Sequence, residues 1–149
     1  MYRNGHNAYR QTGVTTADPK KLILMCYDEA IGSLKIAKEK YLSGDFEDKA
    51  MAIQRAQDFI AELNRALDFE RGGDIARNLH DLYNFMARHV MEGDLKRNMK
   101  AFDDVVGMLE ELKSAWEEVF QGKADQPHQV EPLPHLSPNK YQKVSAVVG

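Results

Sequence analysis

Proline is absent from residues 20–126, whereas residues 127–138 contain four of the five prolines in the chain. Because proline interrupts helices and strands, its absence permits long helices over the first of these stretches. Cysteine is scarce as well, and the single Cys26 excludes an internal disulfide and argues against a structural zinc site. No apolar run approaches the roughly 18 residues of a transmembrane helix, so we expect no membrane insertion.

A strong charge of either sign is also missing. The net charge of -3 gives no electrostatic reason to expect nucleic acid or an anionic membrane as a partner. The polar start of the chain, residues 1–13, lacks the apolar core of a secretory signal, which predicts a cytoplasmic protein. No glutamate is followed three residues later by histidine, the spacing of di-iron helical bundles. We therefore expect no catalytic residues, no metal and no cofactor.

Four helix starts can be located from local signals. Gly-Asp pairs occur at residues 44–45, 73–74 and 93–94, and Asp18 precedes Pro19. Glycine ends helices in the left-handed conformation, and aspartate caps the first turn of the next helix. These signals predict helices at 19–43, 46–71, 75–92 and 95–121. With 149 residues and links this short, we expect one all-α domain, an antiparallel up-down four-helix bundle at 18–121.

The two ends of the chain have a different composition. We expect residues 1–17 to form an extended N-terminal strap, with Tyr9 and Val14 as its sizeable apolar groups near the bundle. Residues 122–149 hold the four clustered prolines and few apolar side chains, so we expect a flexible, disordered tail.

Each expected helix carries an apolar stripe with helical spacing. In the third helix the stripe positions are spaced by four, three, four and four residues. The predicted core stripes are Ile23, Ala30, Leu34, Ala37 and Tyr41; Phe46, Ala50, Ile53, Ile60, Leu63 and Leu67; Ile75, Leu79, Leu82, Met86 and Val90; and Leu95, Met99, Phe102, Val106, Leu109, Trp116 and Phe120.

Apolar residues beyond these stripes point to a binding surface. Residues 22–27 are consecutively apolar around nearly two helical turns, more than one helix face can bury. Further strips are Met25, Gly32 and Ile36; Leu24 and Ile31; Ala52, Phe59 and Ala66; and Met108, Leu112 and Val119. One explanation is packing against the strap, the tail or a rotated neighbouring helix. The other is a groove for the amphipathic helices of a partner.

The chain resembles the flagellar export chaperones of the FliS family. The residues that carry the resemblance are Ala8 and Tyr9, the stretch 16–31, Leu67 and Asp68, the stretch 72–76, Leu79, Leu82, Tyr83, Met86, Val105, Leu109, Leu112 and Trp116. The sequence departs from the family at Cys26 and Glu29, where leucine and glycine are more frequent, and in its longer tail.

The resemblance implies a cytosolic chaperone without catalytic activity. Its partner would be the disordered C-terminal region of flagellin. It would prevent premature polymerisation of flagellin and keep it competent for export. Components of the export gate would be further partners. The resemblance further implies that Tyr9 covers the groove and that Leu22, Met25 and Tyr27 form its floor or rim, with Ile31 beside them. The helical wheel adds Phe59, Tyr83 and Met108 to the predicted partner-binding residues.

Two other functions fit a helical bundle. The same apolar strips could serve an adaptor or self-association module. A histidine phosphotransfer domain needs an exposed histidine near a lysine; His80 projects from the core stripe, but no lysine lies within one turn of His80 or His89.

Overall fold

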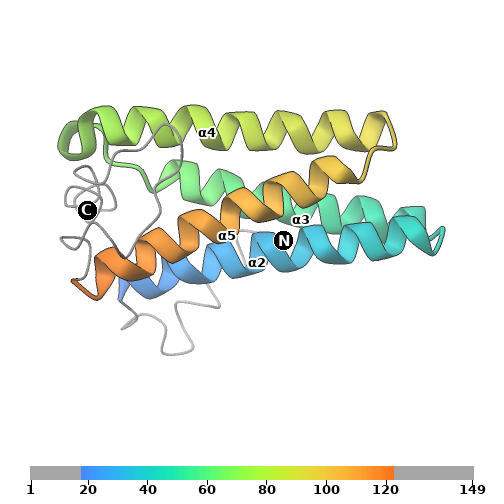
Figure 1. Cartoon of the computed structure of the whole chain (residues 1–149), viewed down its shortest axis with the longest axis horizontal. Helices are drawn as coiled ribbons and strands as arrows, with labels where there is room; N and C mark the ends of the chain where they lie inside the picture. The colour runs from blue at the N-terminus through green and yellow to red at the C-terminus, as the bar shows by residue number, and fades with distance from the viewer. Residues whose placement is uncertain (1–17, 123–149) are drawn as a thin grey trace.

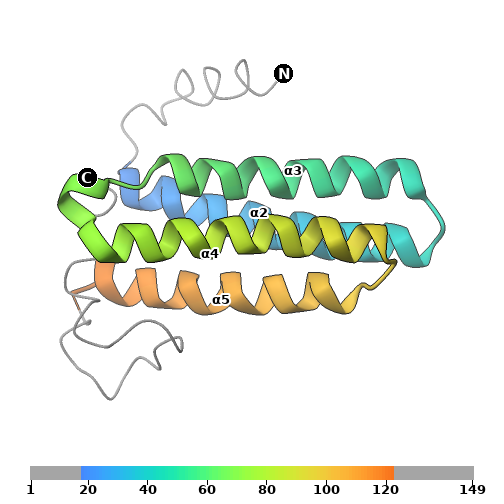
Figure 2. The same cartoon turned by 90° about the horizontal axis from the view of Figure 1, so that it is seen from above.

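Four helices make up the part of the chain that the structure describes. The structure, a computed structural model, describes residues 18–122, so the predicted strap and the tail from residue 123 onward lie outside it. The helices are α2 (Pro19–Leu42), α3 (Phe46–Arg65), α4 (Phe69–Leu95) and α5 (Lys100–Phe120). Successive helices run in opposite directions, and each contacts two neighbours in the cyclic order α2, α3, α4, α5 (Figure 1, Figure 2). The prediction of an all-α four-helix bundle is confirmed for these residues.

The first two helices begin at aspartate caps. The side chain of Asp18 accepts a hydrogen bond from the backbone N–H of Lys20 at 3.0 Å. Asp45 accepts one from the N–H of Asp48 at 3.2 Å. Between these helices Gly44 has a φ of 79°, the left-handed conformation in which glycine carries no steric penalty. Both helices therefore start where the capping residues predict.

The connection between α3 and α4 differs from the prediction. Helix α3 ends at Arg65 rather than near residue 71, and α4 begins at Phe69 rather than 75. The cause is Asp68, whose side chain accepts a hydrogen bond from the N–H of Arg71 at 3.0 Å and caps a new helix. Gly73, with φ 52° and ψ -124°, then kinks α4 one turn after its start. Gly73 therefore interrupts the helical backbone where the Gly-Asp pair predicts, but one helical turn capped by Asp68 already precedes it.

The expected boundary at residues 93–94 is wrong. Helix α4 continues through Gly93 to Leu95, and α5 begins only at Lys100. Gly93 is buried, and a Cβ atom added there would lie 2.6 Å from the Cβ of Ala101. The left-handed residue is Arg97, with a φ of 56°, and the following N–H of Asn98 bonds to the Gly93 carbonyl at 2.8 Å. Glycine here permits close packing, and arginine takes the conformation expected of glycine.

The predicted core stripe of the third helix is buried along its whole length. Of the residues assigned to the core stripes of the other helices, Tyr41, Leu67, Val106 and Phe120 are only half-buried, and three more are exposed. Phe46 is 58% exposed and Leu95 is 80% exposed, and Ala50 is also exposed. Phe46 is the first residue of α3 and Leu95 is the last of α4, so both extend past the region where the other helices could cover them.

The two ends of the bundle are different. Helix α2 begins and α5 ends at one end of the bundle, whereas the α2–α3 and α4–α5 connections lie at the other (Figure 1, Figure 2). We refer to the latter as the connection end. Among residues 18–122, no helix combines the length and apolar character needed to cross a bilayer.

Candidate functional site

Three of the residues predicted to bind a partner lie in the core instead. Tyr27 and Ile31 of α2 and Tyr83 of α4 are buried. Tyr27 lies one turn after Ile23 and one turn before Ala30, which are both core residues. Tyr27 therefore belongs to the core stripe and not to a surplus strip. Tyr83 is buried beside Leu82 because α4 packs against both α3 and α5 and buries more than one narrow stripe. None of the three offers an open surface to a partner.

The two tyrosines form a hydrogen-bonded cluster with Trp116. Their hydroxyl oxygens are 2.5 Å apart, and the indole N–H of Trp116 donates to the Tyr27 oxygen at 2.8 Å. The cluster joins α2, α4 and α5 across the bundle. Burial raises the pKa of Tyr27 well above its usual range, so the phenol stays neutral. The polar atoms satisfy one another, which is the condition for placing them in a core.

Leu22, Met25 and Phe59 are half-buried. Leu22 and Met25 lie one turn before Cys26 and Glu29, and Glu29 faces Arg55 of α3. We call this junction, with Leu22, Met25, Cys26 and Glu29 of α2 and Arg55, Phe59 and Glu62 of α3, the α2–α3 seam. Across it Arg55 forms an ion pair with Glu29, and the Arg55 guanidinium lies 5.3 Å from the centroid of the Phe59 ring. The ion pair therefore lies over the Phe59 side chain of the seam.

Electrostatics keep the cysteine of this seam protonated. Burial, together with the carboxylates of Glu62 and Glu29, raises the pKa of the Cys26 thiol to about 11. A protonated thiol is a poor nucleophile and acts as a small apolar group. The α2–α3 seam is thus suited to contact and not to covalent chemistry.

Met108 lies on the opposite side of the bundle, at the α4–α5 seam, which we define by Phe85 and His89 of α4 and Asp104 and Met108 of α5. The Nε2 atom of His89 lies 3.1 Å from the Oδ2 atom of Asp104. The Phe85 ring stacks on the His89 ring, and their centroids are 5.1 Å apart. Since the two helices are antiparallel, Met108, one turn after Asp104, lies level with Phe85, one turn before His89. Phe85 is 42% exposed, and Met108 is half-buried against the core.

Phe85 was missed by the sequence analysis. Its signal is an aromatic residue one turn from a histidine, immediately beside the core residue Met86. The signal is weak, because a single aromatic side chain beside the core stripe does not form a second apolar strip of the kind found on the other three helices.

The connection end carries apolar side chains that were also unassigned to a site. Leu42, the last residue of α2, is 72% exposed. The exposed Phe46 follows it at the start of α3, and the exposed Leu95 is the last residue of α4. Met51 and Met91 are exposed as well.

His80 does not have the surroundings of a phosphoacceptor. Its Nδ1 lies 2.7 Å from the side-chain oxygen of Asn64, and its Nε2 lies 3.2 Å from the side-chain nitrogen of Asn84. The Phe69 ring contacts it edge-on at a centroid distance of 5.6 Å. The Nδ1 contact therefore joins α4 to α3, whereas the Nε2 contact lies within α4. Within residues 18–122, no cluster of three histidine, cysteine or acidic side chains could hold a metal ion.

The predicted partner-binding residues thus fall into three groups. Leu22, Met25 and Phe59 lie at the α2–α3 seam, and Met108 lies at the α4–α5 seam. Tyr27, Ile31 and Tyr83 are in the core. Tyr9 is outside the described residues.

Comparison with known proteins identifies relatives over most of the chain. The family described as "Flagellar protein FliS" matches residues 2–123. The chain is 33% identical over 121 residues to the flagellar secretion chaperone FliS of Vibrio cholerae, covering 78% of this chain and 89% of that protein. It is 34% identical over 121 residues to the flagellar secretion chaperone FliS of Salmonella typhimurium, covering 78% and 90%. The protein of the same description from Bacillus subtilis is 27% identical over 126 residues, covering 85% and 93%.

Proposed function

This chain belongs to the FliS family of flagellar proteins, and from that premise we propose that it escorts flagellin by binding the flagellin C-terminal segment. FliS proteins are secretion chaperones and not enzymes. In the proposed role, the protein acts in the bacterial cytosol, prevents premature polymerisation of flagellin and keeps it competent for export. Delivery would bring the complex to components of the export gate.

The observation that carries this proposal is the half-buried α2–α3 seam. Phe59 lies beneath the Arg55 guanidinium, and the Arg55 and Glu29 side chains are 60% and 36% exposed. An ion pair exposed to this degree contributes about 0–1 kcal/mol, so moving it aside costs little. An incoming apolar side chain would then gain contact with the Phe59 ring. The seam can therefore open for a partner without loss of core packing.

The α4–α5 seam supports a partner that extends around the bundle. Methionine has a flexible, polarisable side chain that adapts to different contacts, and Met108 lies level with the partly exposed Phe85 ring. A disordered segment that folds on binding can cover separated surfaces, and the entropy lost on ordering limits its affinity. Limited affinity suits a chaperone that must release its cargo.

Calorimetric titration with a synthetic peptide of the flagellin C-terminal segment tests the proposal. In Phe59→Ser the contact with the ring is lost, and burial of such a side chain is worth about 1.5–3 kcal/mol, so we expect Kd to rise roughly tenfold or more. Met51→Ser is the matched control, because Met51 lies on the same helix, is 65% exposed and belongs to neither seam. Equal Kd values for Phe59→Ser and wild type, with both proteins folded by circular dichroism, would reject the assigned site.

Light scattering separates this function from a self-association module. A chaperone should be a monomer whose melting temperature rises with the peptide, since a ligand that binds only the folded state stabilises it. A dimer that persists at all protein concentrations, and whose melting temperature does not change with the peptide, would favour self-association instead.

A further inference from the structure

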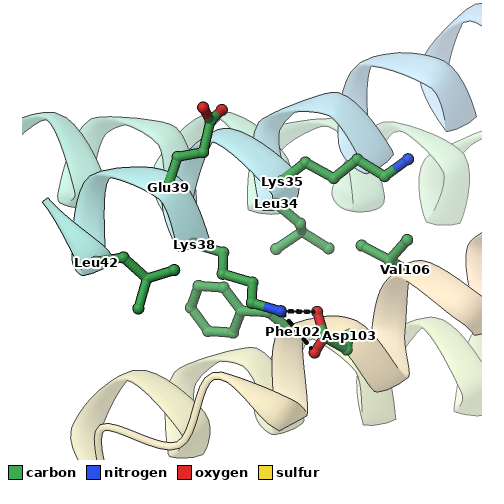
Figure 3. Close-up of a pocket in the computed structure, with 8 residues that line it drawn as sticks. All are labelled: Leu34, Lys35, Lys38, Glu39, Leu42, Phe102, Asp103 and Val106. Atoms are coloured by element: carbon green, nitrogen blue, oxygen red, sulfur yellow. Dashed lines mark hydrogen bonds and ion pairs between the residues drawn. The ribbon is translucent and has the colours of Figure 1, made fainter.

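A hollow between α2 and α5 belongs to neither seam. It has a volume of about 310 Å³ and is lined by eight residues, among them Leu34, Leu42, Phe102 and Val106. Lys38 and Asp103 join across it, with the Lys38 Nζ 2.9 Å from each carboxylate oxygen (Figure 3). Leu34 and Phe102 are buried, whereas Leu42 is mostly exposed. The hollow therefore has a closed apolar floor and one open apolar wall.

The size of the hollow defines what could fill it. An apolar cavity of roughly 150 Å³ accommodates a benzene molecule, so about 310 Å³ has room for two aliphatic side chains. The charged groups on its rim, Lys35, Lys38, Glu39 and Asp103, comprise two of each sign. No net charge therefore selects the occupant, and apolar contact must provide the affinity.

The distance from the end of α5 to the hollow can be worked out along the helix. Val106 and Phe102 precede Gly122 by 16 and 20 residues, which at about 1.5 Å per residue places the hollow about 24–30 Å from Gly122. Gly122 has a φ of 74° and its N–H bonds to the Val119 carbonyl at 3.0 Å, so the chain leaves the helix axis at this point.

The 27 residues that follow Gly122 can span this distance. In an extended chain each residue advances by about 3.1–3.4 Å, so Val130 can lie about 25–27 Å from Gly122 and Leu133 about 34–37 Å away. These two aliphatic residues are the first sizeable apolar groups of the segment, and Leu136 follows three residues after Leu133. Pro132 and Pro134 lie among them and reduce the entropy lost when the chain is fixed.

We propose that residues 130–136 of this chain bind in the hollow between α2 and α5, with Val130 and Leu133 or Leu136 against Leu42 and Val106. The segment returns along the α2–α5 face and covers the exposed wall of the hollow. It leaves the α2–α3 seam open, so the proposal does not depend on the proposed binding of flagellin. Residues 1–17 are a poorer fit, because the large apolar side chains with comparable reach there are Met1 and the rings of Tyr2 and Tyr9, and none forms a pair of branched aliphatic groups like Val130 and Leu133.

Methyl NMR of the full-length chain tests the proposal. The variant Leu133→Ser/Leu136→Ser should shift the methyl resonances of Leu42 and Val106, because their contacts are removed. The matched control Val147→Ser/Val148→Ser changes two apolar residues of the same segment and should leave both resonances in place. Unchanged resonances in the first variant, or equal shifts in both variants, would overturn the proposal. A shift caused by Tyr9→Ser alone would assign the hollow to residues 1–17 and would overturn it as well.

A disulfide trap gives an independent measurement on folded protein. In a Cys26→Ser background, Leu42→Cys combined with Leu133→Cys should form an intramolecular disulfide under mild oxidation, since a disulfide requires Cα atoms within about 7 Å. The control combines Leu133→Cys with Ile36→Cys, an exposed residue of α2 that does not line the hollow. Trapping at Leu42 and not at Ile36 is the expected result. Equal trapping at both positions, or trapping at neither, would contradict the proposal.

Discussion

The Tyr27 hydroxyl is hydrogen-bonded to two other buried groups, so its removal should lower the stability of the bundle. In Tyr27→Phe the Trp116 N–H loses its acceptor at 2.8 Å, and the Tyr83 hydroxyl loses its partner at 2.5 Å. A buried polar group without a partner costs about 1–3 kcal/mol. Because both groups are affected and the ring itself remains, we expect the free energy of unfolding to fall by about 2–6 kcal/mol.

Tyr83→Phe is the matched comparison. It removes the bond between the two hydroxyls but leaves the Trp116 bond to Tyr27, so we expect a loss of about 1–2 kcal/mol. Urea unfolding followed by circular dichroism measures both variants. The midpoint should fall further for Tyr27→Phe while the m-value stays constant, since the surface exposed on unfolding does not change.

The same pair separates a core role from a binding role. Because Tyr27 and Tyr83 are buried, both variants should bind the flagellin peptide with the wild-type Kd at temperatures where they are folded. Equal losses of stability in the two variants would refute the shared role of the Tyr27 hydroxyl. Weaker peptide binding by folded Tyr27→Phe would return this residue to the partner surface.

Three further predictions concern the backbone and the N-terminal strap. Gly93→Ala should destabilise the bundle by about 1–3 kcal/mol, because the new Cβ atom would lie 2.6 Å from the Cβ atom of Ala101. Gly107→Ala is the control: no atom lies within 4 Å of the new Cβ, so this variant should be neutral or stabilising by up to about 1 kcal/mol. Similar melting temperatures for these two variants would contradict the close approach. Arg97→Gly should raise the unfolding free energy by about 1 kcal/mol, because Arg97 has a φ of 56°, and a lower urea midpoint would speak against this reason. Tyr9→Ala should increase the affinity for the flagellin peptide while leaving the melting temperature unchanged; a collapse of the melting temperature with unaltered peptide affinity would show that Tyr9 supports folding instead.

The starts of α2 and α3 were predictable, because at each a side chain acts on the backbone next to it. Asp18 and Asp45 both cap the helices that the sequence assigned to them. The Asp68 cap obeys the same rule, but no glycine precedes this aspartate, so no Gly-Asp pair marks the start of α4.

Local rules failed where a residue serves a distant contact. Gly93 resembles a helix end in sequence, yet it is required for the approach of α5 to α4 at Ala101. Arg97 takes a left-handed conformation that is uncommon for arginine, so sequence preference points away from it. Both features depend on how two helices meet, which a single-helix pattern does not contain.

The candidate site was predictable in part for a related reason. A helical wheel gives the relative positions of Leu22, Met25 and Tyr27 but not the rotation of the helix against its neighbours. The structure turns Tyr27 into the core and leaves Leu22 and Met25 at the seam.

Methionine methyl NMR during titration with the flagellin C-terminal peptide tests the central claim most directly. The described helices supply probes at the two seams, Met25 and Met108, and probes away from them, the exposed Met51 and Met91 and the buried Met86. We predict that the Met25 and Met108 resonances shift on saturation while those of Met51, Met91 and Met86 do not. Shifts confined to Met51 and Met91, or saturable binding that moves neither Met25 nor Met108, would contradict the account.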